Sequence, residues 1–407
     1  MKKNLIISAL LTIAIFPAMA QSGNNKVVTA GDYEKAAKFL SNNTGKLVDR
    51  SDVRPNWLGD GNLWYSVNVE GGKEYVLINT KDGSRKTAKD LKSLLPSATE
   101  EKSPVGRRNF SVEVISPDGK KAAFIRDWNL WIRDLESKKE TQLTTDGSKD
   151  FGYATDNAGW KKSDRAILLW SPDSKKIATF QQDQRHVSDM YLVTTNVGEP
   201  KLESWKYPIP SDSDIIRIHR VIIETDVPKV IRLKIPSDAR RGTLCDDISC
   251  SGSFDDNEWN ADGSKLAFVS SSRDHKEAKM RIADAATGEV KEIFEEKVAT
   301  QYESGQGRIN WHFLAASNEI IWYSERDDWG HLYLYNATTG QLKNQITKGD
   351  FVVTMLLKTD EKNRVLFFEA NGREKGRDPY FSHFYRVDFT GKNLQLLTPE
   401  DGNHTIS

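Results

Sequence analysis

The chain has 407 residues, too many for one compact core unless that core is built from repeats. Hydrophobic residues make up 38% of the chain and aromatic residues 10%, which excludes a disordered protein. Basic and acidic residues each number 58, so the formal net charge is zero. Because no long basic run occurs either, no nucleic-acid partner is expected.

Residues 1–20 have the three parts of a cleavable signal peptide. Two lysines follow the first methionine, residues 5–16 are mostly apolar, and residues 18–20 (Ala-Met-Ala) form a cleavage site before Gln21. The apolar stretch is too short to span a membrane, and no other stretch is suited to do so. We therefore expect a bacterial protein that is exported to the periplasm or secreted.

Residues 21–50 follow as an N-terminal segment in which one short helix is expected. Apolar side chains between positions 32 and 46 recur at helical spacing. Asp32 is the expected N-cap of this helix, and Gly45 is its expected end. We expect the helix to pack on the body of the protein.

From position 51 onward the chain is predicted to be all-β, with short strands separated by turns. A turn followed by an apolar strand recurs at residues 116–119 (Ser-Pro-Asp-Gly), 171–174 (Ser-Pro-Asp-Ser) and 260–263 (Asn-Ala-Asp-Gly). Such recurrence at intervals of tens of residues is typical of a β-propeller. We count about seven units, which predicts seven to eight four-stranded blades over residues 51–407. Unrelated hairpins in one large β protein are the alternative.

The boundaries of these units follow from the connections between them. One unit is expected to end at residues 190–193, and residues 197–214 are expected to cross to the next unit, with strands at 217–224 and 230–235. Residues 403–407 look like the first strand of a further blade. The last blade is therefore expected to be incomplete and the chain to be a fragment.

Tryptophans stand at the start of several units: Trp57, Trp170, Trp259 and Trp311. Because an indole ring buries a large apolar area, we expect these side chains to pack between neighbouring blades.

The two cysteines, Cys245 and Cys250, lie close together in the sequence. In an oxidising compartment a local disulfide is the first interpretation, and free thiols or a metal site are the alternatives. Two thiols alone do not complete a tetrahedral shell, and the seven histidines lack the spacing of a helical metal site. No metal or other cofactor is expected.

Four stretches have a distinctive combination of residues: 168–173 (Leu-Leu-Trp-Ser-Pro-Asp), 206–208 (Lys-Tyr-Pro), 324–335 and 395–398. In combination they resemble the N-terminal β-propeller of dipeptidyl peptidase IV-type serine peptidases, in the prolyl oligopeptidase superfamily. The resemblance implies a propeller that restricts access of peptides to an α/β-hydrolase domain, whose nucleophile lies in a Gly-x-Ser-x-Gly motif. The 407 residues contain no such motif, so no catalytic residue is assigned and the chain alone is expected to be inactive.

The resemblance also implies where the free amine of a peptide is held, namely by a pair of glutamates before the Trp-Ser-Pro turn. Residues 153–162 contain no glutamate pair, which puts strict release of dipeptides in doubt and leaves tripeptidyl or endopeptidase specificity as alternatives. Asp156 and Asn157 are the candidate substrate-binding residues of this connection. The alternative is that they cap a turn.

The resemblance therefore implies the substrate-positioning propeller of an exported serine exopeptidase. Its expected partners are peptides and the missing hydrolase domain, and a homodimer is a further expectation. The alternative is a free-standing periplasmic propeller that binds a protein partner, since the same turn sequences serve both.

Overall fold

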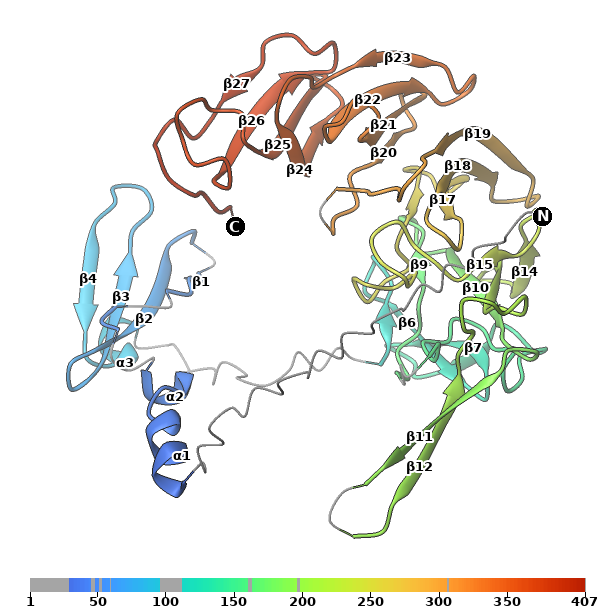
Figure 1. Ribbon diagram of the computed structural model, residues 1–407, viewed down its shortest axis with the longest axis horizontal. Coiled ribbons are helices and arrows are strands. Elements are labelled where there is room, and N and C mark those ends of the chain that lie inside the picture. The colour runs from blue at the N-terminus through green and yellow to red at the C-terminus, as the bar shows by residue number, and fades with distance from the viewer. Residues whose placement is uncertain are drawn as a thin grey trace, which may run out of the picture. The chain divides into compact units, whose positions relative to one another are not determined.

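The structure is a computed structural model in which the chain forms two compact units, Met1–Arg108 and Asn109–Ser407 (Figure 1). It describes residues 29–44, 48–50, 53–58, 60–95, 112–159, 163–195, 198–305 and 307–406. The expected signal peptide and Gly45 lie outside these ranges. Within them, no helix is long and apolar enough to cross a membrane. The predicted boundary between residues 21–50 and residues 51–407 stays a prediction.

The first unit contains short helices and one antiparallel sheet. The helices that the structure describes here are α1 (Ala30–Ala37), α2 (Ser41–Thr44) and α3 (Leu91–Leu94). The sheet has the order β1-β2-β3-β4, with strands Asn56–Trp57, Leu63–Val69, Gly72–Ile78 and Arg85–Ala88. Trp57 lies on β1, the edge strand of this sheet, and its expected packing between blades stays a prediction.

Helix α1 begins earlier than the sequence predicted. Thr29, not Asp32, is the N-cap: its hydroxyl accepts the N–H of Asp32 (3.4 Å), and the Asp32 carboxylate accepts the N–H of Thr29 (2.9 Å). Asp32 is thus the N3 residue of a capping box. No residue of α1 is buried, because its apolar stripe is short and largely made of alanine. The expected packing of this helix on the body of the protein stays a prediction.

The second unit is a series of antiparallel sheets that follow one another along the chain (Figure 1). Four of them have their strands in sequential order. They are β5–β8 (Val114–Ile115, Lys121–Arg126, Asn129–Asp134, Glu140–Gln142), β16–β19 (Asn257–Trp259, Lys265–Ser271, Glu277–Asp284, Val290–Lys297), β20–β23 (His312–Leu314, Glu319–Ser324, His331–Asn336, Leu342–Gln345) and β24–β27 (Val352–Asp360, Val365–Asn371, Ser382–Asp388, Gln395–Leu396). The recurring turns at residues 116–119 and 260–263 each join the first two strands of such a meander, and the turn at 171–174 joins the first two strands of a further sheet.

Five strands between residues 169 and 239 belong to one sheet, whereas the sequence predicted two separate units here. The order of this sheet is β14-β13-β10-β9, and β15 also pairs with β13. The strands are β9 (Leu169–Trp170), β10 (Lys176–Asp183), β13 (Arg217–Glu224), β14 (Lys229–Arg232) and β15 (Asp238–Ala239). Since β10 pairs with β13 along its whole length, the strands expected at 217–224 and 230–235 complete the sheet that begins at Leu169 instead of opening a new one.

The segment between β10 and β13 forms a hairpin of its own, β11 (Asp189–Thr194) and β12 (Lys201–Lys206). It projects away from the sheets of the second unit (Figure 1). Its apolar residues Tyr191, Leu192, Val193 and Leu202 are exposed. Residues 190–193 therefore do not end a blade, as the sequence predicted, but extend from one.

The described residues contain six four-stranded antiparallel sheets of this kind, one in the first unit and five in the second, if the added strand β15 is set aside. This number is lower than the predicted seven to eight, because one predicted unit was the second half of another. Residues 403–406 form no strand, although the N–H of His404 donates to the carbonyl of Ser382 (3.1 Å). The all-β class is confirmed, and closure of the sheets into a propeller stays a prediction.

Buried apolar clusters lie between consecutive sheets of the second unit. Three of the predicted tryptophans take part and also donate their indole N–H to the preceding sheet or its connection. The contacts are Trp170 to the carbonyl of Val114 (3.1 Å), Trp259 to the carbonyl of Leu169 (3.2 Å) and Trp311 to the carboxylate of Asp256 (3.2 Å). The predicted packing of these three side chains is confirmed.

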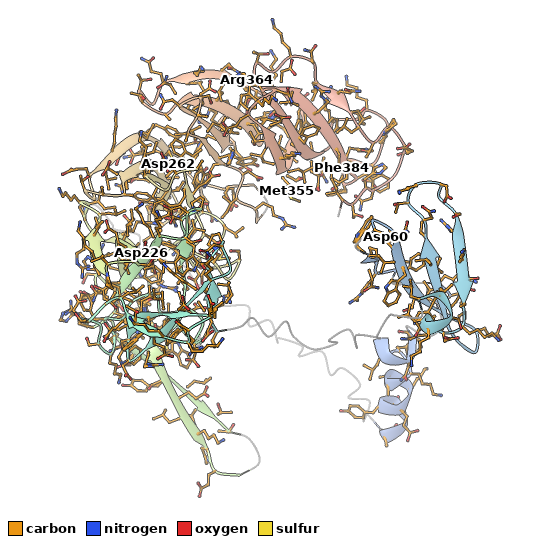
Figure 2. All side chains as sticks on the ribbon, turned by 180° about the vertical axis from the view of Figure 1, so that it is seen from behind. Asp60, Asp226, Asp262, Met355, Arg364 and Phe384 are labelled. Atoms are coloured by element: carbon orange, nitrogen blue, oxygen red, sulfur yellow. A yellow bond between two sulfur atoms is a disulfide. The ribbon has the colours of Figure 1, made fainter. Side chains whose placement is uncertain are left out.

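An ion pair also connects two neighbouring sheets. Arg364, labelled in Figure 2, lies at the turn between β24 and β25. It pairs with the buried Glu319 of β21 at 2.7 Å. Burial of Glu319 would raise its pKa, but hydrogen bonds from Arg364 and Lys343 outweigh this and lower it to about 2.

The repeated turn sequence has a structural role. The hydroxyl of Ser116 donates to Asp118 (2.6 Å) and accepts the N–H five residues later (2.9 Å), and Ser171 with Asp173 repeats both contacts at the same distances. A second repeated contact involves a threonine hydroxyl that accepts a backbone N–H near the start of the third strand. The pairs are Thr144 with Leu130 (2.9 Å), Thr347 with Leu332 (3.0 Å) and Thr398 with Phe384 (3.0 Å). These side chains hold turns and strands together and are not a binding site.

Candidate functional site

A pocket of about 830 Å³ lies in the second unit, a size that suits a small ligand. One wall is mainly apolar and comes from the segment that returns from β12: Tyr207, Pro208, Pro210, Ile215 and Ile216. The rest of the lining includes a set of charged residues: Arg240, Arg241, Asp246, Asp247, Arg273 and Asp274. The pocket therefore offers an apolar surface together with converging ionic groups.

The apolar wall is fixed by its backbone. Pro208 and Pro210 restrict the chain, and the N–H of Asp212 donates to the carbonyl of Ile209 (3.0 Å). Arg273, from the turn between β17 and β18, donates to the carbonyls of Ile209 and Asp212, both at 2.6 Å. These contacts attach the wall to the following sheet.

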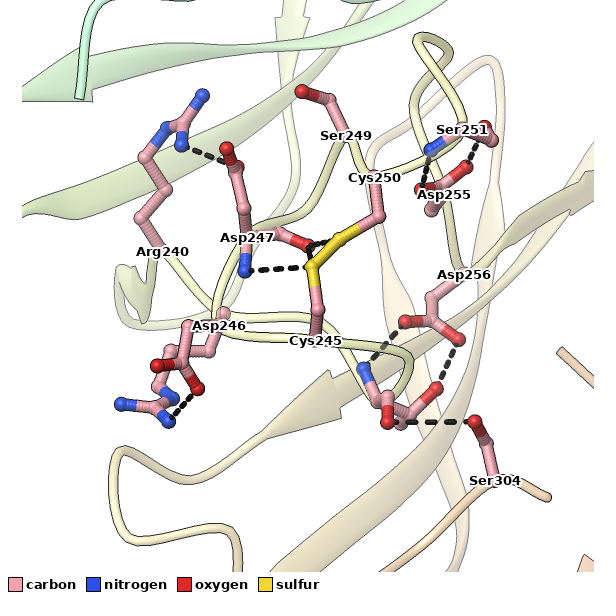
Figure 3. Close-up of a disulfide and its surroundings, with 12 residues drawn as sticks. Arg240, Cys245, Asp246, Asp247, Ser249, Cys250, Ser251, Asp255, Asp256 and Ser304 are labelled. Carbon is pink, nitrogen blue, oxygen red and sulfur yellow. Dashed lines mark hydrogen bonds and ion pairs between the residues drawn. A yellow bond between two sulfur atoms is a disulfide. The ribbon is translucent and has the colours of Figure 1, made fainter. Parts of the chain in front are cut away.

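The floor of the pocket is organised by Arg240, whose side chain is only 2% exposed. Its guanidinium pairs with Asp247, as Figure 3 shows, and with Asp156 at 3.6 Å. Burial lowers the pKa of Arg240 from its usual value, and the two carboxylates act in the opposite direction. The Nε atom of Arg240 has no hydrogen-bond partner in the part of the chain that the structure describes.

The acidic side of the pocket is a loop closed by a disulfide between Cys245 and Cys250, whose Cα atoms are 6.6 Å apart (Figure 3). The sequence left a disulfide, free thiols or a metal site open for these two cysteines, and the structure contains the disulfide. Within the loop, Asp246 pairs with Arg241 (2.6 Å) and with His275 (3.0 Å). The side chain of Asp246 is 85% exposed, so its carboxylate remains accessible at the rim.

The two candidate residues of the sequence analysis lie next to this pocket but already contact protein groups. The side chain of Asp156 is 9% exposed and accepts from the hydroxyl of Ser249 (3.4 Å), in addition to facing Arg240. Asn157 accepts a hydrogen bond from the amide of Gln182 (2.9 Å). In this structure Asp156 acts on the pocket through Arg240. Direct contact of Asp156 or Asn157 with a peptide stays a prediction.

Sequence reasoning missed the basic side chains of the pocket, Arg240, Arg241 and Arg273. The adjacent arginines shortly before the cysteine pair were the available signal, but a charged pair in a sequence does not differ from one on a solvated surface. Within the described residues, no group of three or more histidine, cysteine or acidic side chains is arranged to hold a metal ion.

Comparison with known proteins places the chain in a family. Residues 69–407 match the Dipeptidyl peptidase IV (DPP IV) N-terminal region. The chain belongs to this family. A relative in Tuber melanosporum named probable dipeptidyl-aminopeptidase B is 24% identical over 73% of this chain and 35% of its own length. Dipeptidyl-aminopeptidase B of Aspergillus niger is 22% identical over 72% of this chain and 34% of its own length.

Among solved structures, Porphyromonas gingivalis dipeptidyl peptidase 4 resembles this DPP IV N-terminal region chain with a TM-score of 0.56 and 18% sequence identity. The likeness covers 88% of this chain and 45% of that one, and at this identity it shows the fold alone. The chain spans about a third of the length of the curated relatives named above.

Proposed function

We propose that this chain is the peptide-positioning N-terminal domain of an exported serine exopeptidase of the dipeptidyl peptidase IV type. The family match over residues 69–407 is the observation that carries the proposal. The pocket supports it, because its volume and mixed walls suit a short extended peptide. Since the 407 residues lack Gly-x-Ser-x-Gly, hydrolysis in this proposal is performed by a hydrolase domain, and the chain alone is inactive.

The chemistry of the pocket suggests how a peptide is oriented. Tyr207 and Pro208 supply apolar surface for the side chains of a peptide, including proline. Asp246 supplies the accessible carboxylate at the rim and is therefore our candidate for holding the N-terminal ammonium group in place of the glutamate pair. A free N-terminus is then the feature that the pocket selects.

Export and self-association complete the proposal. The composition of residues 1–20 supports export to the periplasm or secretion. The exposed apolar residues of β11–β12 support a homodimer, because such a surface gains free energy when a second copy covers it. A protein partner of a free-standing propeller is the alternative occupant of the same hairpin.

Calorimetric titration of the 407-residue chain with an unblocked Ala-Pro peptide and with its N-acetylated form tests the proposal. We expect acetylation and Asp246→Asn each to weaken binding by about tenfold, the factor that corresponds to 1.4 kcal/mol. Asp226→Asn is the control, since Asp226 is also an exposed aspartate that pairs with a basic side chain, Lys121 (2.7 Å), and it does not line the pocket. Equal affinity for both peptides would overturn the assignment of Asp246. The absence of peptide binding, together with a stable complex with another protein, would favour the free-standing propeller.

A further inference from the structure

A second groove of about 320 Å³ adjoins the pocket. Ile215, Ala239 and Arg273 line both, so a ligand in the pocket can extend directly into the groove. The other walls of the groove come from the start of β13, from β15, and from the end of β17 and the start of β18.

Basic side chains outnumber acidic side chains in the lining of this groove. Two of its basic side chains have carboxylate partners: Lys279 pairs with Glu295 (3.1 Å), and Arg281 pairs with Glu292 (3.1 Å) and Asp238 (3.3 Å). The acidic Glu277 of the lining is likewise paired, with Lys297 (3.0 Å). The charges of these side chains are therefore largely balanced within the protein.

Arg217 and Arg273 differ from these pairs. In the described part of the chain, each donates to backbone carbonyls and neither forms an ion pair. Arg217 donates to the carbonyl of Ser237 (3.4 Å), and Arg273 to the two carbonyls of the pocket wall. A carbonyl accepts a hydrogen bond but carries no net charge. Two guanidinium charges at the groove thus remain without a carboxylate.

A buried hydroxyl lies in the same lining. Ser271 is 6% exposed, and its Oγ atom has no hydrogen-bond partner among the described residues. Buried polar atoms without partners are uncommon because each loses its hydrogen bonds to water. A ligand oxygen that accepts from Ser271 would restore that bond.

We propose that Arg217, Arg273 and Ser271 bind a carboxylate of the peptide, either an acidic side chain or the C-terminal carboxylate. All three groups donate, and the planar guanidinium matches the two oxygens of a carboxylate. This inference rests on the proposed function for the identity of the ligand as a peptide. It adds that peptides are preferred when an acidic side chain or a free C-terminus supplies this carboxylate.

The test compares pairs of peptides that differ in one charge. Unblocked pentapeptides with Glu or Gln at one position, each with a free or an amidated C-terminus, are titrated into the 407-residue chain. We expect the preferred carboxylate, in the side chain or at the C-terminus, to tighten binding by about tenfold, as one charge-assisted hydrogen bond would. Arg217→Gln should abolish this preference and leave the affinity for the neutral peptide unchanged.

The matched control is Arg377→Gln. Like Arg217, Arg377 donates to backbone carbonyls, here those of Pro399 (2.6 Å) and Glu400 (3.1 Å), and it does not line the groove. Arg273→Lys is a second variant that keeps the charge; it should reduce the preference without abolishing it. Because Arg273 also supports the pocket wall, Arg217 is the residue on which the conclusion depends.

N-acetylglutamate and inorganic phosphate are titrated in parallel, since both are small enough to need the groove but not the pocket. If peptides bind with no preference for a carboxylate, or if Arg217→Gln weakens charged and neutral peptides equally, the inference is overturned while the proposed function stands. If no peptide binds but N-acetylglutamate binds and depends on Arg217, the proposed function fails, and with it the identity of the ligand as a peptide, while the carboxylate site at Arg217 stands. If phosphate binds as tightly as N-acetylglutamate, the groove is a general anion site and not a carboxylate site, which overturns the inference.

Discussion

Replacement of Arg240 by methionine tests the ion pairs at the floor of the pocket. Methionine keeps part of the side-chain volume but removes the cation, so Asp156 retains a negative charge at a position that is 9% exposed. Removing one partner of a buried ion pair costs about 3–5 kcal/mol. Because the Asp247 side chain is 23% exposed and can be hydrated, we expect a loss near the lower limit, about 3 kcal/mol.

A second substitution should recover part of this loss. Asp156→Asn in the Arg240→Met background removes the buried negative charge that Arg240 faces in the wild type. We therefore expect the double variant to be about 1–2 kcal/mol more stable than Arg240→Met alone. Arg185→Met is the control, because Arg185 pairs with Asp183 (2.7 Å) near the surface and should cost less than about 1 kcal/mol.

Urea unfolding of the 407-residue chain, followed by tryptophan fluorescence, gives the midpoint and the slope m for each variant. Free energies are compared only where m is unchanged, since a change in m signals a different unfolded or folded state. Two results would refute the reasoning. One is an Arg240→Met variant within about 1 kcal/mol of the wild type. The other is a double variant that is less stable than Arg240→Met.

Three further predictions concern stability. Replacing Cys245 and Cys250 by serine should cost about 2 kcal/mol, as loop closure over a sequence separation of 5 predicts, and should make the urea midpoint insensitive to dithiothreitol. Burial lowers the pKa of His312, but its contact with Glu258 outweighs this effect and raises the pKa. The contribution of this pair to the free energy of unfolding is therefore complete below about pH 6.5 and declines as the pH rises through the raised pKa. The difference in urea midpoint between the wild type and His312→Gln should shrink accordingly, and a difference that grows with pH would contradict the assignment. Thr347→Val should cost about 1–3 kcal/mol, measured in the same way, because it leaves a buried backbone N–H without an acceptor, and a neutral effect would show that this acceptor is dispensable.

Local features of the fold could be predicted from the sequence. The serine and aspartate of residues 116–119 and 171–174 form their turn with near neighbours, so composition alone reveals them. The number of sheets could not be predicted in the same way. The hairpin β11–β12 has strand-like composition, and only the pairing of β10 with β13 shows that it leaves a blade instead of ending one.

The candidate site was predictable only where its contacts are local. Cys245 and Cys250 lie close in sequence, so a disulfide was the first interpretation. The pairing of Asp156 with Arg240 joins distant parts of the chain, and nothing in the sequence distinguishes Arg240 from the other basic residues that stay exposed. The burial of one arginine is a consequence of tertiary packing.

The central claim is that the chain positions peptides without cleaving them. The most direct measurement incubates the purified 407-residue chain with an unblocked Xaa-Pro peptide and determines binding by calorimetry and integrity of the peptide by mass spectrometry in the same sample. The account predicts saturable binding of a peptide that remains intact. Cleavage that persists through purification and is blocked by a serine-hydrolase inhibitor would contradict it, as would a peptide that does not bind.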